Sequence, residues 1–385
     1  MSQLDEYRKR LDAIDGGLVE LFLRRTEITA RVGEYKKAAG IPVLDAEREQ
    51  RVIESRTQLA STPADRYAVA NLFESIMTLS RRQQRKIVKE GAEDPGYARW
   101  LRQLASQREE VDNPRVVYQG EPGCYSEEAA VGFFGEGVST KGLPWFDDVF
   151  AALAAGEADY AMLPVENSST GSIHQVYDLL AKYEFSLVGE WQVKVEHCLA
   201  ALPGVAMEDI KTVYSHEQGL MQCDKFLDDH RDWQRVPTLD TAGSAKRVSQ
   251  AGDKTAAAIC SKRAAKLYGL NVLAEAINHN TANFTRFVAV SPELELRDGR
   301  DKISTVFSLP HQAGSLHEIL TVFALYGLNL VKLESRPVPD RGWEYIFFLE
   351  CTGDLTAPGM DGVIHELSQL SADFRILGNF KGYEL

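Results

Sequence analysis

Residues 3–39 read QLDEYRKRLDAIDGGLVELFLRRTEITARVGEYKKAA and contain no proline. Apolar side chains recur every seven positions along two adjacent lines of this stretch. One line consists of Leu4, Leu11, Leu18 and Val32, and the other of Tyr7, Ile14, Leu21, Ile28 and Tyr35. The period predicts a single helix about 50 Å long, at about 1.5 Å per residue. A helix of that length must bury its apolar face against partners, so we expect a homodimer.

Arg25 occupies the first of these apolar lines, where a leucine is expected. An unpaired buried guanidinium is costly, so Arg25 either has a partner within the chain or binds an anionic ligand. Lys36 lies about 20° away around the helix axis, so the two cations share one face. Arg8 lies about 25 Å from Arg25 and could serve such a ligand only in the second chain of a dimer. Gly16 and Gly17 indicate either a tight helix crossing or a local weakness.

The composition indicates an ordinary globular protein of more than one domain. A length of 385 residues predicts two to three domains, and 44% hydrophobic with 26% charged residues is typical of soluble proteins. There is no stretch of the ~20 apolar residues that a bilayer requires and no secretory signal, so we expect a cytoplasmic protein without a membrane partner. The net charge of −13 argues against nucleic-acid binding, and the basic run RRQQRK at residues 81–86 is interpreted as a solvated helix end. Five cysteines without a CxxC pair favour reduced thiols and no metal site.

Changes of pattern along the chain predict a multidomain protein. After the long helix, two shorter helical patterns follow at about 44–60 and 65–88, and a polar linker contains one short helix near 98–107. The middle segment alternates short apolar runs with helical patterns, which indicates α/β architecture. The last segment reads as a βαββαβ unit, whose third strand is expected to begin at Trp343. The expected boundaries are 1–90 for the all-α domain, 91–113 for the linker, 114–292 for the α/β domain and 300–385 for the α+β domain.

Further polar residues of the helical segment are spaced so that they share helix faces. Asp45, Arg48 and Glu49 stand at i, i+3 and i+4, and Ser80 and Gln84 stand at i and i+4. Ordinary surface charges would give the same pattern. Two or three cations with a few hydrogen-bonding groups would instead suit a dicarboxylate.

These positions resemble the active site of the all-helical chorismate mutases. The match in order and spacing covers Arg8, Arg25, Lys36, Asp45, Arg48, Glu49, Ser80 and Gln84. The resemblance implies an intertwined dimer that converts chorismate to prephenate, with one arginine contributed by the neighbouring chain. It also implies that Lys36 and Gln84 donate to the ether oxygen, that Arg8, Arg25 and Arg48 hold carboxylates, and that Glu49 holds the ring hydroxyl. Asp45 and Ser80 would complete the substrate site. A pericyclic rearrangement needs no acid, base or nucleophile, only a held conformer and stabilised charge.

Four strings in the middle segment are distinctive: GEPGCYS (120–126), PVENSSTG (164–171), YSHEQGLMQC (214–223) and NFTRF (283–287). A strand, a glycine- or serine-rich turn and a helix together present N–H groups to an anion, but they are also an ordinary turn and helix cap. His197 and His216 lack metal-ligand spacing, which favours structural roles for both.

Together the four strings resemble prephenate dehydratases over about residues 115–290. The resemblance implies two α/β lobes of the periplasmic-binding-protein type, with a cleft where prephenate loses carbon dioxide and water without a cofactor. It implies that Thr285 hydrogen-bonds or protonates the departing hydroxyl, with Glu166 as the alternative acid. The other implied substrate-binding residues are Asn167, Ser168, Gln218, Gln222 and Arg286. Glu217 stands where this family commonly has proline, which leaves Gln218 in place.

The last segment resembles ACT domains that sense phenylalanine. It carries ESRP at residues 334–337, and GSLH at residues 314–317 where the family usually reads GALV. The resemblance implies side-by-side pairing and an effector site for L-phenylalanine at Gly314, Leu316, Glu334, Ser335, Arg336 and Pro337. We therefore expect feedback inhibition, with a purely structural dimerisation module as the alternative.

The three resemblances together predict a bifunctional enzyme of phenylalanine biosynthesis, acting on chorismate and then on prephenate. We expect a homodimer or higher homo-oligomer that uses no metal, cofactor, nucleic acid or membrane. Two alternatives stay open: a non-catalytic amino-acid or ligand sensor built on the same domains, and a dehydratase that prefers arogenate. The presence of Lys36, Gln84 and Thr285 argues against the sensor.

Overall fold

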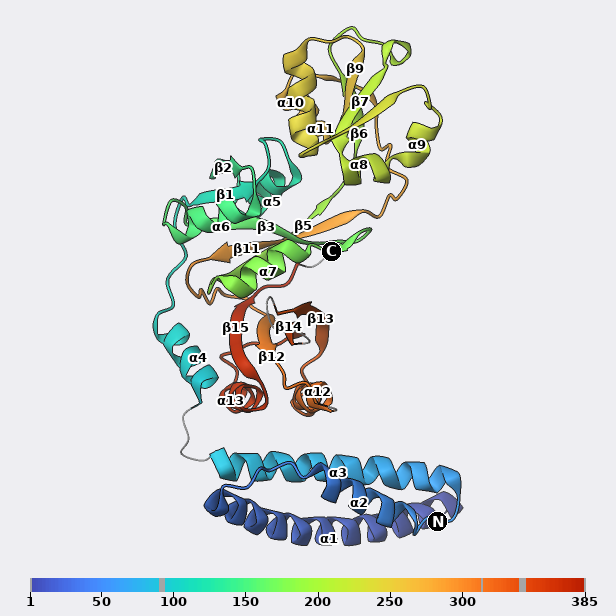
Figure 1. The fold of residues 1–385 in the computed structure, drawn as a ribbon, viewed down its shortest axis with the longest axis vertical. Coiled ribbons are helices and arrows are strands. Elements are labelled where there is room, and N and C mark those ends of the chain that lie inside the picture. Colours follow the sequence, from blue (N-terminus) through green and yellow to red (C-terminus); the bar gives the residue numbers. More distant parts are fainter. Residues whose placement is uncertain (1, 90–93, 313, 339–343, 384–385) are drawn as a thin grey trace. The chain divides into compact units, whose positions relative to one another are not determined.

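The computed structural model describes residues 2–89, 94–312, 314–338 and 344–383. The chain divides into two compact units, Met1–Pro95 and Gly96–Leu385 (Figure 1). Within the described ranges, no helix combines the length and the hydropathy needed to span a bilayer.

The first unit consists of the helices α1 (Gln3–Ala39), α2 (Ala46–Thr57) and α3 (Pro63–Lys89). Ser2 caps α1, because its hydroxyl accepts from the backbone N–H of Asp5 while the Asp5 carboxylate accepts from the N–H of Ser2. Gly40 adopts a left-handed conformation, with φ of 65°, at the other end. The helix predicted over residues 3–39 is confirmed.

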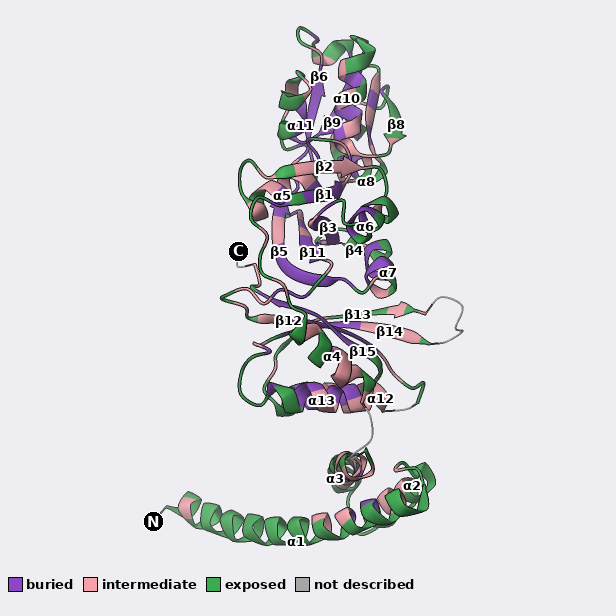
Figure 2. Ribbon diagram, turned by 90° about the vertical axis from the view of Figure 1, so that its left-hand side faces the viewer, coloured by how far each residue is buried: buried purple, intermediate pink, exposed green. Residues whose placement is uncertain are grey.

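The apolar lines of α1 are uncovered within the described chain (Figure 2). Leu21 is 63% exposed and Ile14 is 59% exposed, whereas only Thr29 and Gly33 of this helix are buried. Gly16 and Gly17 are helical, and no heavy atom of the described residues lies within 4 Å of a Cβ placed on either glycine. These glycines therefore do not mark a helix crossing inside this chain. A continuous exposed apolar stripe is unusual for a finished protein surface.

The second unit contains two α/β lobes, as the sequence predicts. The sheet of lobe 1 has the order β2-β1-β3-β11-β5, with β4 beside β3, and the sheet of lobe 2 has the order β10-β6-β9-β7-β8. Lobe 1 comprises β1 (Arg115–Gln119), α5 (Tyr125–Phe134), β2 (Ser139–Leu143), α6 (Phe146–Ala154), β3 (Tyr160–Asn167), β4 (Gly171–Ser172), α7 (His174–Lys182), β5 (Ser186–Lys194) and β11 (Phe284–Ser291). Lobe 2 comprises β6 (Cys198–Ala201), the 3-10 helix η1 (Met207–Asp209), β7 (Thr212–His216), α8 (Glu217–Gln222), α9 (Asp224–Asp228), β8 (Gln234–Thr238), α10 (Thr241–Ala251), β9 (Ala256–Cys260), α11 (Lys262–Leu267) and β10 (Asn271–Ala274).

Strand β11 returns from lobe 2 and inserts between β3 and β5, antiparallel to both. Its register places Thr285 opposite Asn167 on β3. Strand β3 is almost wholly buried, as expected for a sheet that helices cover on both faces. The NFTRF and PVENSSTG strings are more than a hundred residues apart in the sequence, and the fold brings them together where β3 ends and β11 begins.

The C-terminal part of the second unit is an antiparallel sheet in the order β13-β14-β12-β15, with two helices. Its elements are β12 (Lys302–Ser308), α12 (Ser315–Leu325), β13 (Leu330–Pro337), β14 (Tyr345–Thr352), α13 (Met360–Leu370) and β15 (Ala372–Phe380). The predicted βαββαβ order is confirmed. Trp343, the predicted start of the third strand, lies outside the described residues.

The short helix predicted in the linker is α4 (Pro95–Ala105), and it is packed rather than free. Trp100 is buried in the same core as Phe374 on β15, and the Gln103 side chain donates to the carbonyl of Ile376 at 3.2 Å. The second half of the expected linker thus belongs to the second unit, while residues 90–93 lie outside the described ranges. The domain boundaries expected from the sequence stay predictions.

Candidate active sites

In the helical unit, α1 and α3 meet in parallel, because Arg25 contacts Ser80 and Gly33 contacts Gln84. The Arg25 guanidinium donates to Oγ of Ser80, whose own proton is donated to the Ile76 carbonyl at 2.7 Å. Burial lowers the pKa of Arg25. Within residues 2–89, no carboxylate pairs with this arginine. A half-buried cation with one neutral partner is suited to bind an anion.

Gln84 follows Ser80 on the same side of α3. Its side chain is buried, and its Oε1 atom has no hydrogen-bond partner among the described residues. A Cβ at Gly33 would lie 3.2 Å from Cα of Gln84, so the glycine permits the close contact of the two helices. Lys36, one turn beyond Gly33, donates from Nζ to the Val43 carbonyl at 2.6 Å. An unpaired buried amide oxygen is costly, and a hydrogen-bond donor on a ligand would pair with it.

The predicted residues of α2 have local roles in the single chain. Asp45 caps the helix, because its Oδ1 accepts from the backbone N–H of Arg48 at 2.9 Å. Glu49 pairs with Arg81 of α3. Arg81 and Gln84 both point inward, which corrects the interpretation of the run RRQQRK as a solvated helix end.

Arg8 is the predicted mutase residue that stands apart. It is exposed near the start of α1, 3.9 Å from Asp5 on its own helix. At about 1.5 Å per residue it lies about 25 Å along the axis from Arg25. The single chain thus gathers Arg25, Ser80 and Gln84 but does not bring Arg8 to them.

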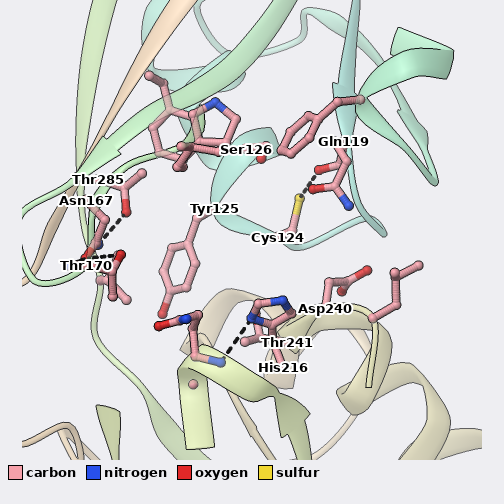
Figure 3. A pocket seen from close by; sticks show the side chains of 18 of the residues that line it. Gln119, Cys124, Tyr125, Ser126, Asn167, Thr170, His216, Asp240, Thr241 and Thr285 are labelled. Carbon is pink, nitrogen blue, oxygen red and sulfur yellow. Dashed lines mark hydrogen bonds between the residues drawn. The ribbon is translucent and has the colours of Figure 1, made fainter. Parts of the chain in front are cut away.

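In the second unit, a cavity of about 540 Å³ lies between the two lobes (Figure 3). This volume is in the range of small-molecule sites. The polar residues that line it are Gln119, Tyr125, Ser126, Asn167, Thr170, Ser172, Gln175, Thr285 and, from the crossover and lobe 2, His197, His216, Gln218, Gln222, Asp240 and Thr241. Neither lysine nor arginine occurs among the described lining residues.

Thr285 and Asn167 form the centre of the polar wall. Nδ2 of Asn167 donates to Oγ1 of Thr285 at 2.9 Å and to Oδ1 of Asn283 at 2.8 Å. Oδ1 of Asn167 accepts from the backbone N–H groups of Ser169 and Thr170 at 2.9 and 3.1 Å. These contacts fix the amide orientation, so Thr285 accepts from Asn167 and keeps its own proton for a group in the cleft.

A chain of hydrogen bonds extends from this pair across the cleft. Nδ2 of Asn283 donates to Oε1 of Gln222 at 3.1 Å, and the same oxygen lies 3.0 Å from Nε2 of His197. Nδ1 of His197 lies 3.2 Å from the Tyr125 hydroxyl. Because Oε1 only accepts, His197 carries its proton on Nε2 and none on Nδ1, while the Tyr125 hydroxyl donates its own proton to the Glu196 carbonyl at 2.9 Å. Burial lowers the pKa of His197, which favours this neutral ring.

Glu166 and Arg286 do not line the cleft, although both were predicted to bind substrate. Successive side chains of a strand point to opposite faces, so the neighbours of Asn167 and Thr285 turn away from the cavity. Arg286 pairs there with Glu350 at 2.8 Å. The roles of Glu166 and Arg286 in substrate binding stay predictions.

Two other contacts complete that reverse face. Glu166 binds Lys332 of β13 at 2.7 Å, and Glu190 of β5 pairs with Arg286 at 2.9 Å. Ser168 is also outside the cavity lining, because its hydroxyl accepts from the N–H of Phe284 and donates to the carbonyl of Ala282. In the structure Ser168 bridges two loops through these bonds, and its role in substrate binding stays a prediction.

Residues of the ESRP string are divided between the two faces of β13. The Ser172 hydroxyl donates to Glu334 at 2.6 Å, and Arg336 pairs with Asp178 at 2.8 Å. Glu334 and Arg336 thus contact lobe 1, whereas Ser335 and Pro337 are exposed. Gly314 is the N-cap of α12, with φ of 89°, and Leu316 is half-buried in the first turn.

Models of three families match the chain in order: type II chorismate mutases at residues 7–85, prephenate dehydratases at 116–295 and ACT domains at 303–369. A bifunctional chorismate mutase/prephenate dehydratase of Stutzerimonas stutzeri is 30% identical, over 98% of this chain and 97% of that protein. The chain belongs to this family. A structure of prephenate dehydratase from Arthrobacter aurescens in complex with L-Phe is 34% identical, covers 69% of this chain and 89% of its own, and has a TM-score of 0.63.

The fold of the second unit also occurs in a protein that is described by a different activity. GqqA, described as a novel type of quorum quenching acylase, is 30% identical with a TM-score of 0.64, covering 70% of this chain and 98% of its own. Function must therefore be argued from the site and not from the fold alone.

Reasoning from sequence missed three groups at the interlobe cavity: Tyr125 and His197, which line it, and Asn283, which is buried behind the lining and donates to Gln222. Tyr125 and Asn283 belong to distinctive strings, but a string does not say which side chain enters a cleft. His197 was interpreted as structural because it lacks metal-ligand spacing. In the described ranges, no cluster of histidine, cysteine, aspartate or glutamate could hold a metal ion.

Proposed function

We propose that the chain catalyses two consecutive reactions of phenylalanine biosynthesis and is inhibited by L-phenylalanine. The helical unit rearranges chorismate to prephenate, and the cleft converts prephenate to phenylpyruvate, carbon dioxide and water. The observation that carries the proposal is the Thr285–Asn167 pair inside an interlobe cavity, in a chain whose other segments match mutase and ACT families.

In the mutase reaction, the site holds a compact conformer and stabilises charge on the breaking ether oxygen. Arg25 binds a carboxylate, because its half-buried cation has only the Ser80 hydroxyl as a partner in the described chain. Gln84 and Lys36 donate to the ether oxygen, for which Lys36 releases the Val43 carbonyl. The Gln84 amide is neutral, so its role does not require acidic pH.

A second copy of the chain completes this site with Arg8. The exposed apolar lines of α1 supply the surface that the copy would cover, as Leu21 and Ile14 illustrate. A dimer also removes the cost of leaving that stripe in water. Arg48 and Glu49 remain the proposed contacts to carboxylate and ring hydroxyl, and Glu49 would share its charge between Arg81 and that hydroxyl.

In the dehydratase reaction, Thr285 donates to the departing hydroxyl. Asn167 holds the threonine oxygen, which leaves the proton directed at the cleft. The electron pair of the broken C–CO2 bond enters the ring as the C–O bond breaks, and hydroxide takes up one proton to leave as water. Threonine is a weak acid, so aromatisation supplies most of the driving force. Gln218 and Gln222 orient the substrate.

Acyl transfer is not favoured by the same cleft. Burial raises the pKa of the Cys124 thiol to about 12, so the thiol is not an activated nucleophile. Thr285 accepts from an amide instead of donating to a base.

The proposal is tested by following chorismate and phenylpyruvate in one reaction, with and without phenylalanine. We expect chorismate to be consumed, phenylpyruvate to accumulate and phenylalanine to suppress that accumulation. Accumulation of prephenate alone would redirect the second unit towards another substrate, with arogenate tested first. Binding of ligands without any turnover would favour the sensor alternative.

Two variants separate the sites, since they lie in different units. Lys36→Ala should abolish mutase turnover and spare the dehydratase, and Thr285→Ala should do the reverse. Mixing Arg8→Ala with Arg25→Ala chains should restore part of the mutase activity through hybrid dimers. No recovery despite demonstrated subunit exchange would contradict the shared site.

A further inference from the structure

We infer that the N-terminus of α5 and the Ser126 hydroxyl bind the substrate carboxylate that is retained in the product. This inference rests on the proposed dehydratase function and names a binding group for it. It starts from the charge of the cleft. Prephenate carries two carboxylates, yet the described lining residues include Asp240 and no lysine or arginine. The negative charge of the substrate must therefore be balanced by hydroxyl and backbone N–H groups.

Two of the helices that begin at the cleft are already capped by their own side chains. Nδ1 of His216 accepts from the N–H of Gln218 at 3.2 Å at the start of α8. The Asp240 carboxylate accepts from the N–H of Gly243 at 2.5 Å at the start of α10. Neither terminus offers its first-turn donors freely to a ligand.

In contrast, no side chain caps the starts of α5, α6 and α7, which also border the cavity. At α5 the N-cap residue is Cys124. The Cys124 thiol donates instead towards the Gln119 carbonyl at 3.7 Å. Burial raises the pKa of this thiol to about 12, so it stays neutral beside the first turn. The first-turn N–H groups of Ser126 and Glu127 therefore have only this neutral sulfur, a weak acceptor, beside them.

Ser126 supplies the independent observation. It is only 7% exposed, it lines the cavity, and its hydroxyl has no hydrogen-bond partner among the described residues. Figure 3 shows Ser126 among the cavity side chains without a dashed bond to any of them. The Ser126 hydroxyl thus faces the cavity with its proton available to an acceptor on a bound ligand.

Two acidic residues lie in the same turn, Glu127 and Glu128, and Arg263 of α11 acts on the charge of both. The Glu127 carboxylate accepts from the N–H of Gly123 at 2.7 Å and pairs with Arg263 of α11 at 3.2 Å. Lobe 2 also holds the preceding loop, because Ser261 donates to the Gly123 carbonyl and Tyr268 donates to the Pro122 carbonyl. The helix terminus is therefore fixed, and the charge of Glu127 is paired.

The chemistry decides which carboxylate binds there. The ring carboxylate must lose its electron pair to the ring, and donors that stabilise it as an anion would stabilise the ground state more than the transition state. The pyruvyl carboxylate keeps its charge throughout the reaction, so donors to it bind substrate, transition state and product alike. We assign the α5 subsite to the pyruvyl carboxylate, which phenylpyruvate also carries.

Steady-state kinetics of Ser126→Ala test the assignment, with Ser249→Ala as the control. Ser249 lies on α10, where its hydroxyl donates to the carbonyl of Tyr268 after α11, and it does not line the cavity. In Ser126→Ala we expect the KM for prephenate to rise roughly 10- to 100-fold, which is the loss expected for one hydrogen bond to a charged group. The kcat should change little. The inhibition constant of phenylpyruvate should rise by the same factor. Ser126→Asp should lose more than Ser126→Ala, because it places a charge against the carboxylate.

Three results would overturn the subsite: an unchanged KM, a fall in kcat alone, or a raised KM with unchanged inhibition by phenylpyruvate. The last result would mean that the departing carboxylate binds there. Retained mutase activity and an unchanged circular dichroism spectrum would show that the variants are folded. If the unmodified chain does not turn over prephenate, the proposed function fails by itself. Calorimetric binding of phenylpyruvate to the unmodified chain and to Ser126→Ala then still decides the subsite.

Discussion

Arg286→Met is the perturbation that most directly separates a substrate-binding arginine from a structural one. Arg286 is 12% exposed and contacts the carboxylates of Glu190 and Glu350 at 2.9 and 2.8 Å. Burial opposes its charge, but Glu350, followed by Tyr177 and Glu190, raises its pKa above the ordinary arginine value. Methionine keeps most of the side-chain length and removes the charge.

The cost can be worked from the contacts that are lost. Glu190 keeps Lys302 at 2.6 Å, whereas Glu350 has no second ion pair among the described residues. Removing one partner of a buried ion pair costs about 3–5 kcal/mol, because the other charge stays buried and unpaired. At about 2 °C per kcal/mol for a large domain, the melting temperature of the second unit should fall by about 6–10 °C. Arg286→Met combined with Glu350→Gln should recover part of that loss.

Thermal unfolding and prephenate kinetics together test this reasoning. Arg235→Met is the matched control, because Arg235 pairs with Asp228 at 2.9 Å on the surface, where such pairs contribute about 0–1 kcal/mol. Below its melting temperature, Arg286→Met should keep kcat/KM within about tenfold of the parent chain. Unchanged stability with a loss of roughly 100-fold or more in kcat/KM would refute the structural assignment and restore the predicted substrate contact.

Three further changes have defined outcomes. Asp178→Asn removes the charge that pairs with Arg336 at 2.8 Å. It should leave the dehydratase kcat near normal and weaken phenylalanine inhibition several-fold in a dose–response assay. Unchanged inhibition would show that this ion pair does not couple phenylalanine binding to dehydratase activity. Gly17→Ala should raise the free energy of unfolding of the helical unit by about 1 kcal/mol, measured in urea. The reason is that, apart from the adjacent backbone of α1, no described heavy atom lies within 4 Å of the new Cβ. Lower stability together with lost self-association would instead indicate that two copies of α1 cross at this position. Burial depresses the pKa of folded His197 below the value of 6.5 expected when unfolded, so its contribution to stability is complete above pH 6.5 and is lost as the pH falls through the folded pKa. His197→Asn should therefore flatten the acid side of the stability profile measured by chemical unfolding, and an unaltered slope would contradict the neutral ring.

Sequence periodicity predicted those elements whose packing is local or repetitive. The seven-residue repeat gave α1 to the residue, because helix phase depends only on spacing. The βαββαβ order was likewise readable from alternating apolar runs and helical patterns. In contrast, α4 was interpreted as part of a linker, because nothing in its own composition shows that Trp100 enters the core beside Phe374.

The sequence predicted which segments form the candidate sites, but not which side chains of those segments face the cleft. Asn167 and Thr285 do line the cleft, but their neighbours Glu166 and Arg286 do not. A match of consecutive residues to a family motif does not tell these two pairs apart. The alternation of side chains along a strand does, because neighbouring residues face opposite sides of the sheet. The contact between Tyr125 and His197 depends on two lobes closing around a cavity, and no spacing along one strand or helix encodes it.

The two faces of β3 and β11 also suggest why the reverse face is charged. Asn167 and Thr285 point into the cleft, while Glu166 and Arg286 behind them are bound to Lys332 and Glu350 of the ACT sheet. Neighbouring residues share one backbone, so a shift of that sheet against lobe 1 must pull on the strands that position Thr285. A regulatory ligand then needs no contact with the substrate to alter turnover; it only has to favour one position of the sheet. An apolar interface would be at least as stable as these buried ion pairs. Charged side chains can exchange partners when the ACT sheet moves a short distance against lobe 1, so this interface would allow two positions of the sheet. A tightly packed apolar interface would resist such a movement.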